Sequence, residues 1–403
     1  MKKMVGDSKQ HQDNLERLRI LYVLPGYPRM ANGHLSYASW LIDKMKDKHD
    51  ISVFAPDDCA EKTMHCHKVN DINVYKLMIP MPISRQTPIR TLLVWLRFFP
   101  SVIYQLYKLL ESREIQVIHT TYHSYNYIFR ILCFIKGIKY IVTLHGSETV
   151  YFNKIPWQHR KLVRFVIRGA DAVVAVSVAL KKSAGDVFPE ISDITAIHNG
   201  IDTEEVQSVD QNNVIVDFPL ELPDRYCLIV GRLHPVKGID IAINSWNEVY
   251  AHDPEIYLLI VGDGDAYSEY QSLINTSNAK ERIILLGGQE NSTVRILMSK
   301  ALLLLLPSRS EGLPAVCLEA GMARLPIVGS DVGGVSEVID DAVNGYLVPT
   351  EDPVALATKT IELLTDDEKR IRFGNELRFK VLNNFDSRLC SKAYDEIYRA
   401  LSL

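Results

Sequence analysis

The stretch Ser308-Arg-Ser-Glu-Gly-Leu-Pro-Ala-Val-Cys-Leu-Glu319 decides the fold of this chain, because it follows six apolar residues and leads into a helix. The apolar run, Ala301 to Leu306, has the composition of a parallel strand that is covered on both faces. Pro307 ends this strand, Gly312 permits an unusual backbone turn, and Pro314 suits the first helical position because it needs no amide partner there. The sequence therefore predicts a strand, a loop and a helix whose first amides suit an anion or a group of hydroxyls.

Two carboxylates stand on either side of this helix start. Glu311 belongs to the loop before the helix, and Glu319 lies about a turn and a half inside it. One carboxylate can therefore reach the reacting end of a bound molecule while the other holds a different part of it. Two glutamates with this spacing are by themselves more often solvated groups on a capped helix, so the rest of the chain decides between the two interpretations.

Runs of apolar residues recur along the chain at intervals that leave room for a helix between strands. The first series comprises 20–24, 51–55, 116–119, 140–144 and 171–177, and the second comprises 226–230, 256–261, 282–286, 301–306 and 325–329. Such alternation is typical of a parallel sheet with helices on both faces. We therefore predict an α/β protein with two Rossmann-like domains, whose sheets face each other across a cleft that holds the ligand.

A polar segment with little periodicity separates the two series of strands. We predict a mobile tail at 1–17, an N-terminal domain at 18–205, a linker at 206–223 and a C-terminal domain at 224–385. A last helix is predicted over 386–403. Its apolar residues recur every four positions and form one stripe that has to cover a surface: Leu389, Ala393, Ile397 and Leu401.

The composition argues against several other classes of protein. The 403 residues are 47% apolar and 23% charged, which is ordinary for a globular protein. A formal net charge of −4 at pH 7 gives no reason to expect nucleic acid as a partner. The first 17 residues lack the apolar core of a secretion signal, so we expect a cytoplasmic protein.

A basic, glycine-bounded loop follows the first strand of the second domain. Gly231-Arg-Leu-His-Pro-Val-Lys-Gly238 lies where a doubly wound sheet offers a phosphate site. Arg232 can contact two phosphate oxygens at once, and the ammonium of Lys237 can follow charge as it builds on a leaving group. A solvated basic loop is the simpler interpretation of this motif in isolation. The chain has neither a P-loop nor a G-x-G-x-x-G after a strand, so kinase and dehydrogenase functions lose their main support.

The Glu311-Gly-Leu-Pro314 start, the Ile327 to Ile339 segment and the Gly231 to Gly238 loop together resemble the nucleotide-sugar site of retaining glycosyltransferases with the GT-B fold, family four (glycosyl transferases group 1). The resemblance implies a donor site in the C-terminal domain, an acceptor side in the N-terminal domain, and a last helix that crosses back onto the latter. Packing of that helix on the C-terminal domain is the simpler alternative. The implied donor contacts are Gly33, Arg232, Lys237, Glu311, Gly312, Leu313, Pro314, Ala315 and Glu319, and the implied catalytic residues are His145, Arg232, Lys237 and Glu311.

Two elements of the N-terminal domain match the same family. The loop from Leu24 to Leu35 leaves the first strand and places Gly33 where the backbone can approach a diphosphate closely. Thr143-Leu-His-Gly-Ser-Glu148 ends another strand, and the resemblance implies that His145 meets the donor sugar. Further matching positions, which line the cleft or the exit from the domain, are Ser177 and 198–202.

The resemblance implies that a sugar passes from a nucleoside-diphosphate sugar to an acceptor hydroxyl with retained configuration, in glycan, polysaccharide or glycolipid biosynthesis. The diphosphate would leave under the pull of Arg232, Lys237 and helix-end amides, and one of its oxygens would help deprotonate the acceptor. Glu311 would hold sugar hydroxyls and Glu319 the ribose. The alternatives are a nucleotide-sugar epimerase or a glycan phosphorylase of the same fold, and a non-catalytic scaffold that binds a nucleotide sugar.

We predict that no metal ion or other cofactor takes part. Asp263 and Asp265 form the D-x-D pattern that holds a divalent cation in the other large glycosyltransferase fold. Here the pair lies in a glycine-containing turn after a strand, where aspartate is common for conformational reasons. Arg232 and Lys237 already supply the countercharge for a diphosphate.

The stretch 85–113 mixes basic and aromatic side chains: Arg85, Arg90, Arg97, Lys108 and Arg113 with Trp95, Phe98, Phe99, Tyr104 and Tyr107. Arg97, Pro100 and Lys108 interrupt any run long enough to cross a bilayer. A core helix and an interfacial surface both remain as interpretations. Membrane contact would place the enzyme at the inner face of the cell membrane, with a glycan or lipid-linked acceptor.

Overall fold

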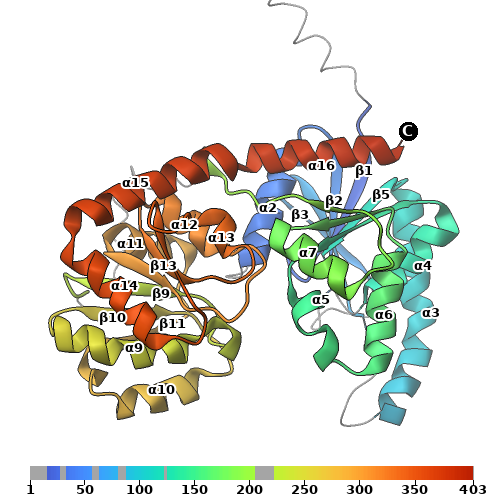
Figure 1. The fold of residues 1–403 in the computed structure, drawn as a ribbon. Helices are drawn as coiled ribbons and strands as arrows, with labels where there is room; N and C mark the ends of the chain where they lie inside the picture. Colours follow the sequence, from blue (N-terminus) through green and yellow to red (C-terminus); the bar gives the residue numbers. More distant parts are fainter. Residues whose placement is uncertain are drawn as a thin grey trace, which may run out of the picture.

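The computed structural model describes residues 16–27, 33–56, 63–79, 88–121, 125–204 and 222–402, but not the side chains of 33–36 and 88–95. The predicted tail and linker therefore lie outside the described residues, apart from 16–17 and 222–223. Figure 1 shows two α/β domains side by side, with the last two helices running along one edge of both.

The N-terminal domain is built on a sheet of eight strands in the order β3-β4-β2-β1-β5-β6-β7-β8. The strands are β1 Arg19–Val23, β2 Asp50–Pro56, β3 His65–Val69, β4 Ile72–Leu77, β5 Val117–Thr121, β6 Lys139–Leu144, β7 Ala172–Ala175 and β8 Ile194–Ala196. All neighbours are parallel except β3 with β4. The helices are α2 Gly33–Met45, α3 Pro88–Ser112, α4 Asn126–Lys136, α5 Ser147–Val150, η1 Phe152–Lys154, α6 Trp157–Arg168 and α7 Val178–Val187.

The C-terminal domain contains a six-stranded sheet in the order β11-β10-β9-β12-β13-β14, and all its neighbouring strands are parallel. Its strands are β9 Tyr226–Val230, β10 Tyr257–Val261, β11 Ile283–Gly287, β12 Leu303–Leu306, β13 Ile327–Ser330 and β14 Gly345–Val348. Its helices are η2 Pro235–Lys237, α9 Ile239–His252, α10 Tyr267–Thr276, η3 Lys280–Arg282, α11 Asn291–Lys300, α12 Ala315–Met322, α13 Val335–Val338, α14 Pro353–Thr365 and α15 Asp367–Asn384. The predicted fold class, two parallel-sheet α/β domains, is confirmed.

Two boundaries predicted around the deciding stretch are wrong. The strand does not begin at Ala301, because the N–H of this residue donates to Leu297 and closes α11 at 3.0 Å. It begins at Leu303. Pro314 is not the first helical residue, since its φ of −73° and ψ of 117° are extended, and α12 begins at Ala315. Both errors are shifts of one or two residues at an element end.

The chain returns to the N-terminal domain after α15. This helix packs on α12 and α14, whereas the following α16 (Ser387–Ser402) packs on α2. At the junction, the N–H of Ile201 donates to the carbonyl of Phe385 at 2.8 Å, and its own carbonyl accepts the N–H of Ser387 at 2.9 Å. The buried carboxylate of Asp386 accepts a hydrogen bond from Thr203 at 2.6 Å. Backbone and side-chain bonds thus tie the exit of the N-terminal domain to the point where the chain comes back.

Buried hydroxyl groups hold α16 on the N-terminal sheet. The hydroxyl of Tyr398 lies 2.6 Å from Nδ1 of His119, and Nε2 of this imidazole lies 2.7 Å from the hydroxyl of Thr143. The hydroxyl of Tyr394 lies 2.9 Å from that of Thr143 and accepts a hydrogen bond from Tyr37 at 2.9 Å. Each buried polar atom in this set has a partner, which is the condition for burying it at low cost.

The side chains that α16 buries differ from the predicted stripe. Leu389 is 50% exposed, whereas Cys390, Tyr394 and Tyr398 are buried. The contact face is therefore centred one residue further along the helix. The remaining predicted positions only pack against the edge of the same core: Ala393, Ile397 and Leu401.

The buried imidazole of His119 makes folding stability depend on pH. Burial lowers its pKa from 6.5 to about 3. Between pH 6.5 and about 3, His119 is therefore protonated in the unfolded chain but neutral in the folded protein. Its contribution to the free energy of unfolding is complete above pH 6.5 and is lost as the pH falls toward 3. We expect the free energy of unfolding of the wild type to fall by about 1.4 kcal/mol per pH unit more steeply than that of His119→Gln.

Urea unfolding of both proteins between pH 7 and pH 4 measures this difference, because all other titrating groups are common to the two. Parallel pH profiles for the two proteins would contradict the assignment.

Candidate active site

The predicted donor loop follows the buried strand β12 and faces the N-terminal domain. The carboxylate of Glu311 is 8% exposed. The ammonium of Lys237 donates to its Oε1 at 2.7 Å, and the hydroxyl of Ser308 donates to the same oxygen at 2.7 Å. The structure thus joins two residues that the sequence motifs predict separately, and it adds Ser308, which orients the carboxylate and which no motif singles out.

This contact follows from the way the basic loop packs on the end of β12. Gly238 has a φ of 61°, and a side chain there would overlap the carbonyl oxygen of Pro307, so only glycine allows the approach. The N–H of Arg309 donates to the carbonyl of Val236 at 2.8 Å. The two loops therefore form one unit, and the side chain of Lys237 extends from one to the other.

The guanidinium of Arg309 fastens the same two loops from the side. It donates to both carboxylate oxygens of Asp240, in the first turn of α9, at 2.8 and 2.7 Å, and it also pairs with Glu351. Burial alone would raise the pKa of Asp240, but the hydrogen bonds from Arg309 outweigh it and lower that pKa. A bidentate pair has a fixed geometry, so Arg309 sets the position of the basic loop. Its partners lie too far away in sequence to be predicted from a motif.

Arg232 takes a different direction from Lys237. Its side chain is 61% exposed and lies 3.3 Å from the carboxylate of Asp265, in the loop after β10. An exposed pair of this kind contributes little to stability. Arg232 can therefore turn toward an anion at small cost, although the structure does not bring it into contact with Glu311.

The predicted donor contacts between Gly312 and Glu319 differ in how deeply they are buried. Leu313 and Pro314 are buried, while Gly312, Ala315 and Glu319 are half-buried. All five lie on the loop after β12 or in α12. The first amides of α12 lie at the carboxyl end of the sheet. Because α12 begins at Ala315, Glu319 lies about one turn inside this helix, slightly less than the predicted turn and a half.

The N-terminal domain meets this loop backbone to backbone. A side chain at Gly312 would overlap the carbonyl oxygen of His145, and the facing Gly146 has a φ of 120°. The ring of His145 lies edge-on to that of Tyr37, with centroids 5.6 Å apart. The buried carboxylate of Glu148 accepts the N–H of Gly146 at 2.9 Å, and its burial raises its pKa. The backbone of His145 thus stands directly across from the Glu311 loop. The contact of its side chain with a donor sugar stays a prediction.

The role of Gly33 stays a prediction. α2 begins at this residue, and residues 28–32 of the loop before it lie outside the described part of the chain. α2 contacts α12 across the two domains.

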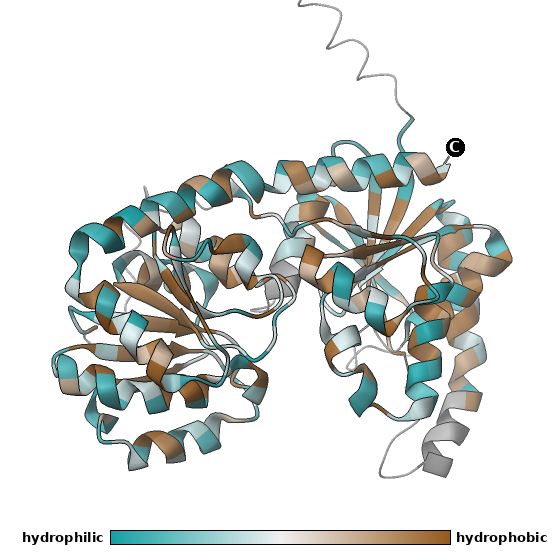
Figure 2. Ribbon diagram, viewed as in Figure 1, coloured by the Kyte–Doolittle hydropathy of each residue, from teal (hydrophilic) through white to brown (hydrophobic). Residues whose placement is uncertain are grey.

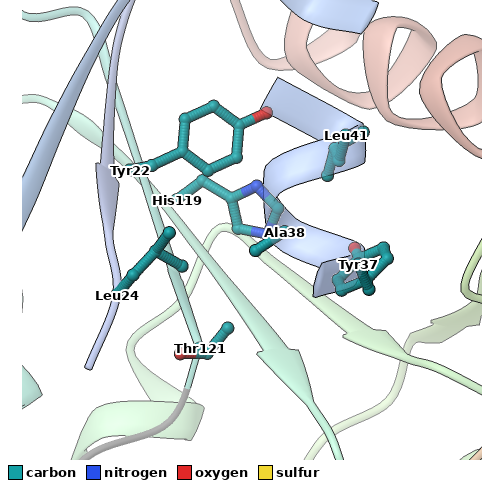
Figure 3. Close-up of a pocket in the computed structure, with 7 residues that line it drawn as sticks. All are labelled: Tyr22, Leu24, Tyr37, Ala38, Leu41, His119 and Thr121. Carbon is teal, nitrogen blue, oxygen red and sulfur yellow. The ribbon is translucent and has the colours of Figure 1, made fainter. Parts of the chain in front are cut away.

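A small apolar pocket opens beside this cleft, between the carboxyl ends of β1 and β5 and the helix α2 (Figure 3). No sequence motif predicts it. Its walls come from residues far apart in the chain: Tyr22, Leu24, Tyr37, Ala38, Leu41, His119 and Thr121. Since Tyr37 also contacts His145, the pocket adjoins the predicted reaction site.

No helix among the described residues is both long enough and apolar enough to cross a bilayer. Within the same residues, no cluster of three or more His, Cys, Asp or Glu side chains is placed to bind a metal ion.

Known proteins match both domains. Residues 33–205 match the family described as Glycosyltransferase Family 4, and residues 210–378 match the one described as Glycosyl transferases group 1. N-acetyl-alpha-D-glucosaminyl L-malate synthase of Bacillus anthracis is 29% identical over 65% of this chain and 68% of its own length. The GPI3 subunit of phosphatidylinositol N-acetylglucosaminyltransferase from Saccharomyces cerevisiae is 25% identical over 74% of this chain and 65% of its own.

Solved structures share the architecture of the whole chain. Sucrose-phosphate synthase from Thermosynechococcus elongatus has a TM-score of 0.76 at 18% identity, covering 96% of this chain and 99% of its own. HepE from Anabaena, in complex with UDP and glucose, has a TM-score of 0.72 at 18% identity, covering 95% and 100%. The shared architecture shows the GT-B fold, and the family matches on both domains show that the chain belongs to the glycosyl transferases group 1.

Proposed function

We propose that this glycosyltransferase moves a sugar from a nucleoside-diphosphate sugar to an acceptor hydroxyl with retention of configuration. The observation that carries the proposal is the 2.7 Å contact between Lys237 and Glu311 opposite the backbone of His145. It supports the proposed pairing of a cation for the leaving diphosphate with a carboxylate for the sugar hydroxyls. The UDP and glucose bound by HepE support a donor of this class.

The proposed chemistry needs no covalent intermediate with the protein. The bond between the anomeric carbon and the diphosphate oxygen breaks, the acceptor oxygen bonds to that carbon from the same face, and its proton passes to a departing phosphate oxygen. Lys237, Arg232 and the first amides of α12 stabilise the negative charge that develops. An ammonium has three N–H donors, so Lys237 can contact the diphosphate while it keeps Glu311 in place. Glu319 would hold the ribose.

The first test removes the phosphate contacts. We expect Lys237→Ala and Arg232→Ala each to lower kcat/KM by about 100-fold or more, because a charge-assisted contact that strengthens in the transition state is lost. Lys300→Ala, which removes an exposed lysine at the end of α11, is the matched control and should retain full activity. Transfer from a panel of nucleotide sugars measures the effect. Wild-type turnover in both site variants would contradict the assignment.

The second test concerns metal ions. We expect excess EDTA to leave most of the activity, because Lys237 and Arg232 take the place that Mg²⁺ occupies at other diphosphate sites. An absolute requirement for Mn²⁺ or Mg²⁺ would instead make Asp263 and Asp265 metal ligands.

We further propose that the acceptor is a glycan or lipid-linked molecule, reached from a membrane surface. Three adjoining helices carry this surface: the ring of Phe99 on α3 stacks on Tyr127 of α4, and α4 packs on α6. They contain nine Lys and Arg residues and one acidic residue, Glu111, in a chain whose net charge is −4. Among the described side chains of these helices, the exposed apolar ones are Leu96, Tyr104, Ile131, Phe134, Ile135, Trp157 and Phe165. Figure 2 shows the hydrophobic colour on the outer helices of this domain.

This surface includes α4 and α6 as well as the predicted stretch 85–113, and the most exposed apolar side chains among those described lie on α4 and not on α3. Phe98 and Phe99 are half-buried, and Val102, Leu106 and Leu109 are core residues, so much of α3 faces the protein. The side chains of 88–95, including Arg90 and Trp95, lie outside the described residues. Of the side chains that the structure describes on these helices, the most exposed apolar one is Phe134 on α4, at 78%.

We expect the protein to sediment with vesicles that contain phosphatidylserine and not with pure phosphatidylcholine, because cations and shallow apolar insertion act together on an anionic surface. Phe134→Ser with Ile135→Ser should release it. Phe379→Ser is the matched control, because this side chain is 67% exposed on α15 of the other domain. Equal release by the control, or no binding at low salt, would remove the membrane from the proposal.

A further inference from the structure

Glu337 joins the two domains at a point that the proposed chemistry does not use. It lies on α13 in the C-terminal domain, and its carboxylate reaches the start of α7 in the N-terminal domain. It accepts the N–H groups of Val178 at 2.9 Å and Ala179 at 2.8 Å, and Nε2 of His198 lies 2.6 Å from its Oε2. Three polar groups of one domain thus converge on one carboxylate of the other.

The electrostatics favour an ionised carboxylate in this place. Burial alone would raise the pKa of Glu337, but the N–H of Ala179, the imidazole of His198 and the N–H of Val178 outweigh it and lower that pKa. The two backbone donors belong to a helix start, which carries a partial positive charge. Hydrogen bonds to a charged acceptor are about twice as strong as neutral ones.

The same segment supports the donor loop on the C-terminal side. A side chain at Gly333 would overlap the carbonyl oxygen of Glu311, and one at Gly334 would overlap that of Gly312. The N–H of Gly334 also donates to Gly312 at 2.9 Å. The turn that presents Glu337 is therefore in backbone contact with the loop that presents Glu311.

On the N-terminal side, the contacts lead to His145. α7 directly follows β7, and β7 pairs with β6 through the register Leu144↔Ala175. His145 is the next residue after β6. A rotation that separated α7 from Glu337 would therefore also move His145 away from Gly312.

We propose that Glu337 is a positioning residue, which locks the N-terminal domain against the donor loop and so sets the distance between His145 and Glu311. It would act without touching the substrate. The proposal rests on the proposed sugar transfer for its kinetic consequence, while its structural consequence is independent of any activity.

The experiment compares Glu337→Ala and Glu337→Gln with wild type. Glutamine keeps the size of the side chain, but its NH2 group faces donors and cannot accept from them. We expect a fall of 10-fold or more in kcat, a change of less than 3-fold in the affinity for UDP, and faster hydrogen exchange at the amides of Val178 and Ala179. The affinity for UDP should change little because the side chains proposed to hold it, Arg232, Lys237 and Glu319, belong to the C-terminal domain, and the N-terminal domain contributes only the predicted backbone contact of Gly33.

Glu362→Gln is the matched control, since this carboxylate binds Lys359, Lys369 and Tyr346 within the C-terminal domain. It should affect thermal stability without changing exchange at α7. If the alanine variant does not fold, the glutamine variant decides by the same criteria.

Unchanged exchange at Val178 and Ala179 together with a kcat within twofold of wild type would overturn the proposal, as would an equal loss of kcat in Glu362→Gln. If the wild type showed no transferase activity while the Glu337 variants still exchanged faster at Val178 and Ala179, the proposed function would be overturned and the positioning role of Glu337 would stand.

Discussion

The contact between Gly312 and the carbonyl of His145 is the constraint on which the rest of the arrangement depends. Two backbones that touch leave no room for a side chain, so van der Waals contact between them holds the loop of Glu311 close to the segment of His145. Two other sets of contacts support the arrangement that keeps Gly312 beside His145. Arg309 fixes the basic loop to the donor loop, and the α15–α16 junction fixes the exit of the first domain to the return of the chain.

Polar groups, more than apolar area, specify how the domains and the last helix are placed. Apolar packing tolerates small shifts, whereas a buried hydroxyl or carboxylate that loses its partner pays the full cost of desolvation. The hydrogen bonds of Tyr394 and Tyr398 select one register of α16 on the sheet. The carboxylates of Asp386 and Glu337 select one orientation between the domains in the same way.

The sequence predicts what is local and fails where partners are distant. The apolar run before Pro307 predicts a strand, and the loop from Gly231 to Gly238 predicts Arg232 and Lys237 as binding residues. Both predictions can be made because strand and turn patterns depend on residues that are neighbours in the sequence. The contact of Lys237 with Glu311 spans 74 residues, so only the packing of the two loops creates it. The buried face of α16 is predicted one residue too early because only its aliphatic residues are counted as apolar. Tyr394 and Tyr398, which carry both a ring and a hydroxyl, form the centre of that face. Arg309 and Glu337 lie within the stretches singled out in the sequence, but nothing in those stretches predicts the residues that they bind.

The position of α16 also has a consequence for the order in which the protein folds. Cys390, Tyr394 and Tyr398 belong to the same buried cluster as β1, at the other end of the described chain. On the ribosome, domains generally fold as units in the order of synthesis. Here the first domain cannot complete its core until a helix made after the second domain has emerged. A nascent chain therefore exposes an unfinished apolar face on α2 throughout synthesis of the C-terminal domain, which is the interval in which a chaperone would be needed.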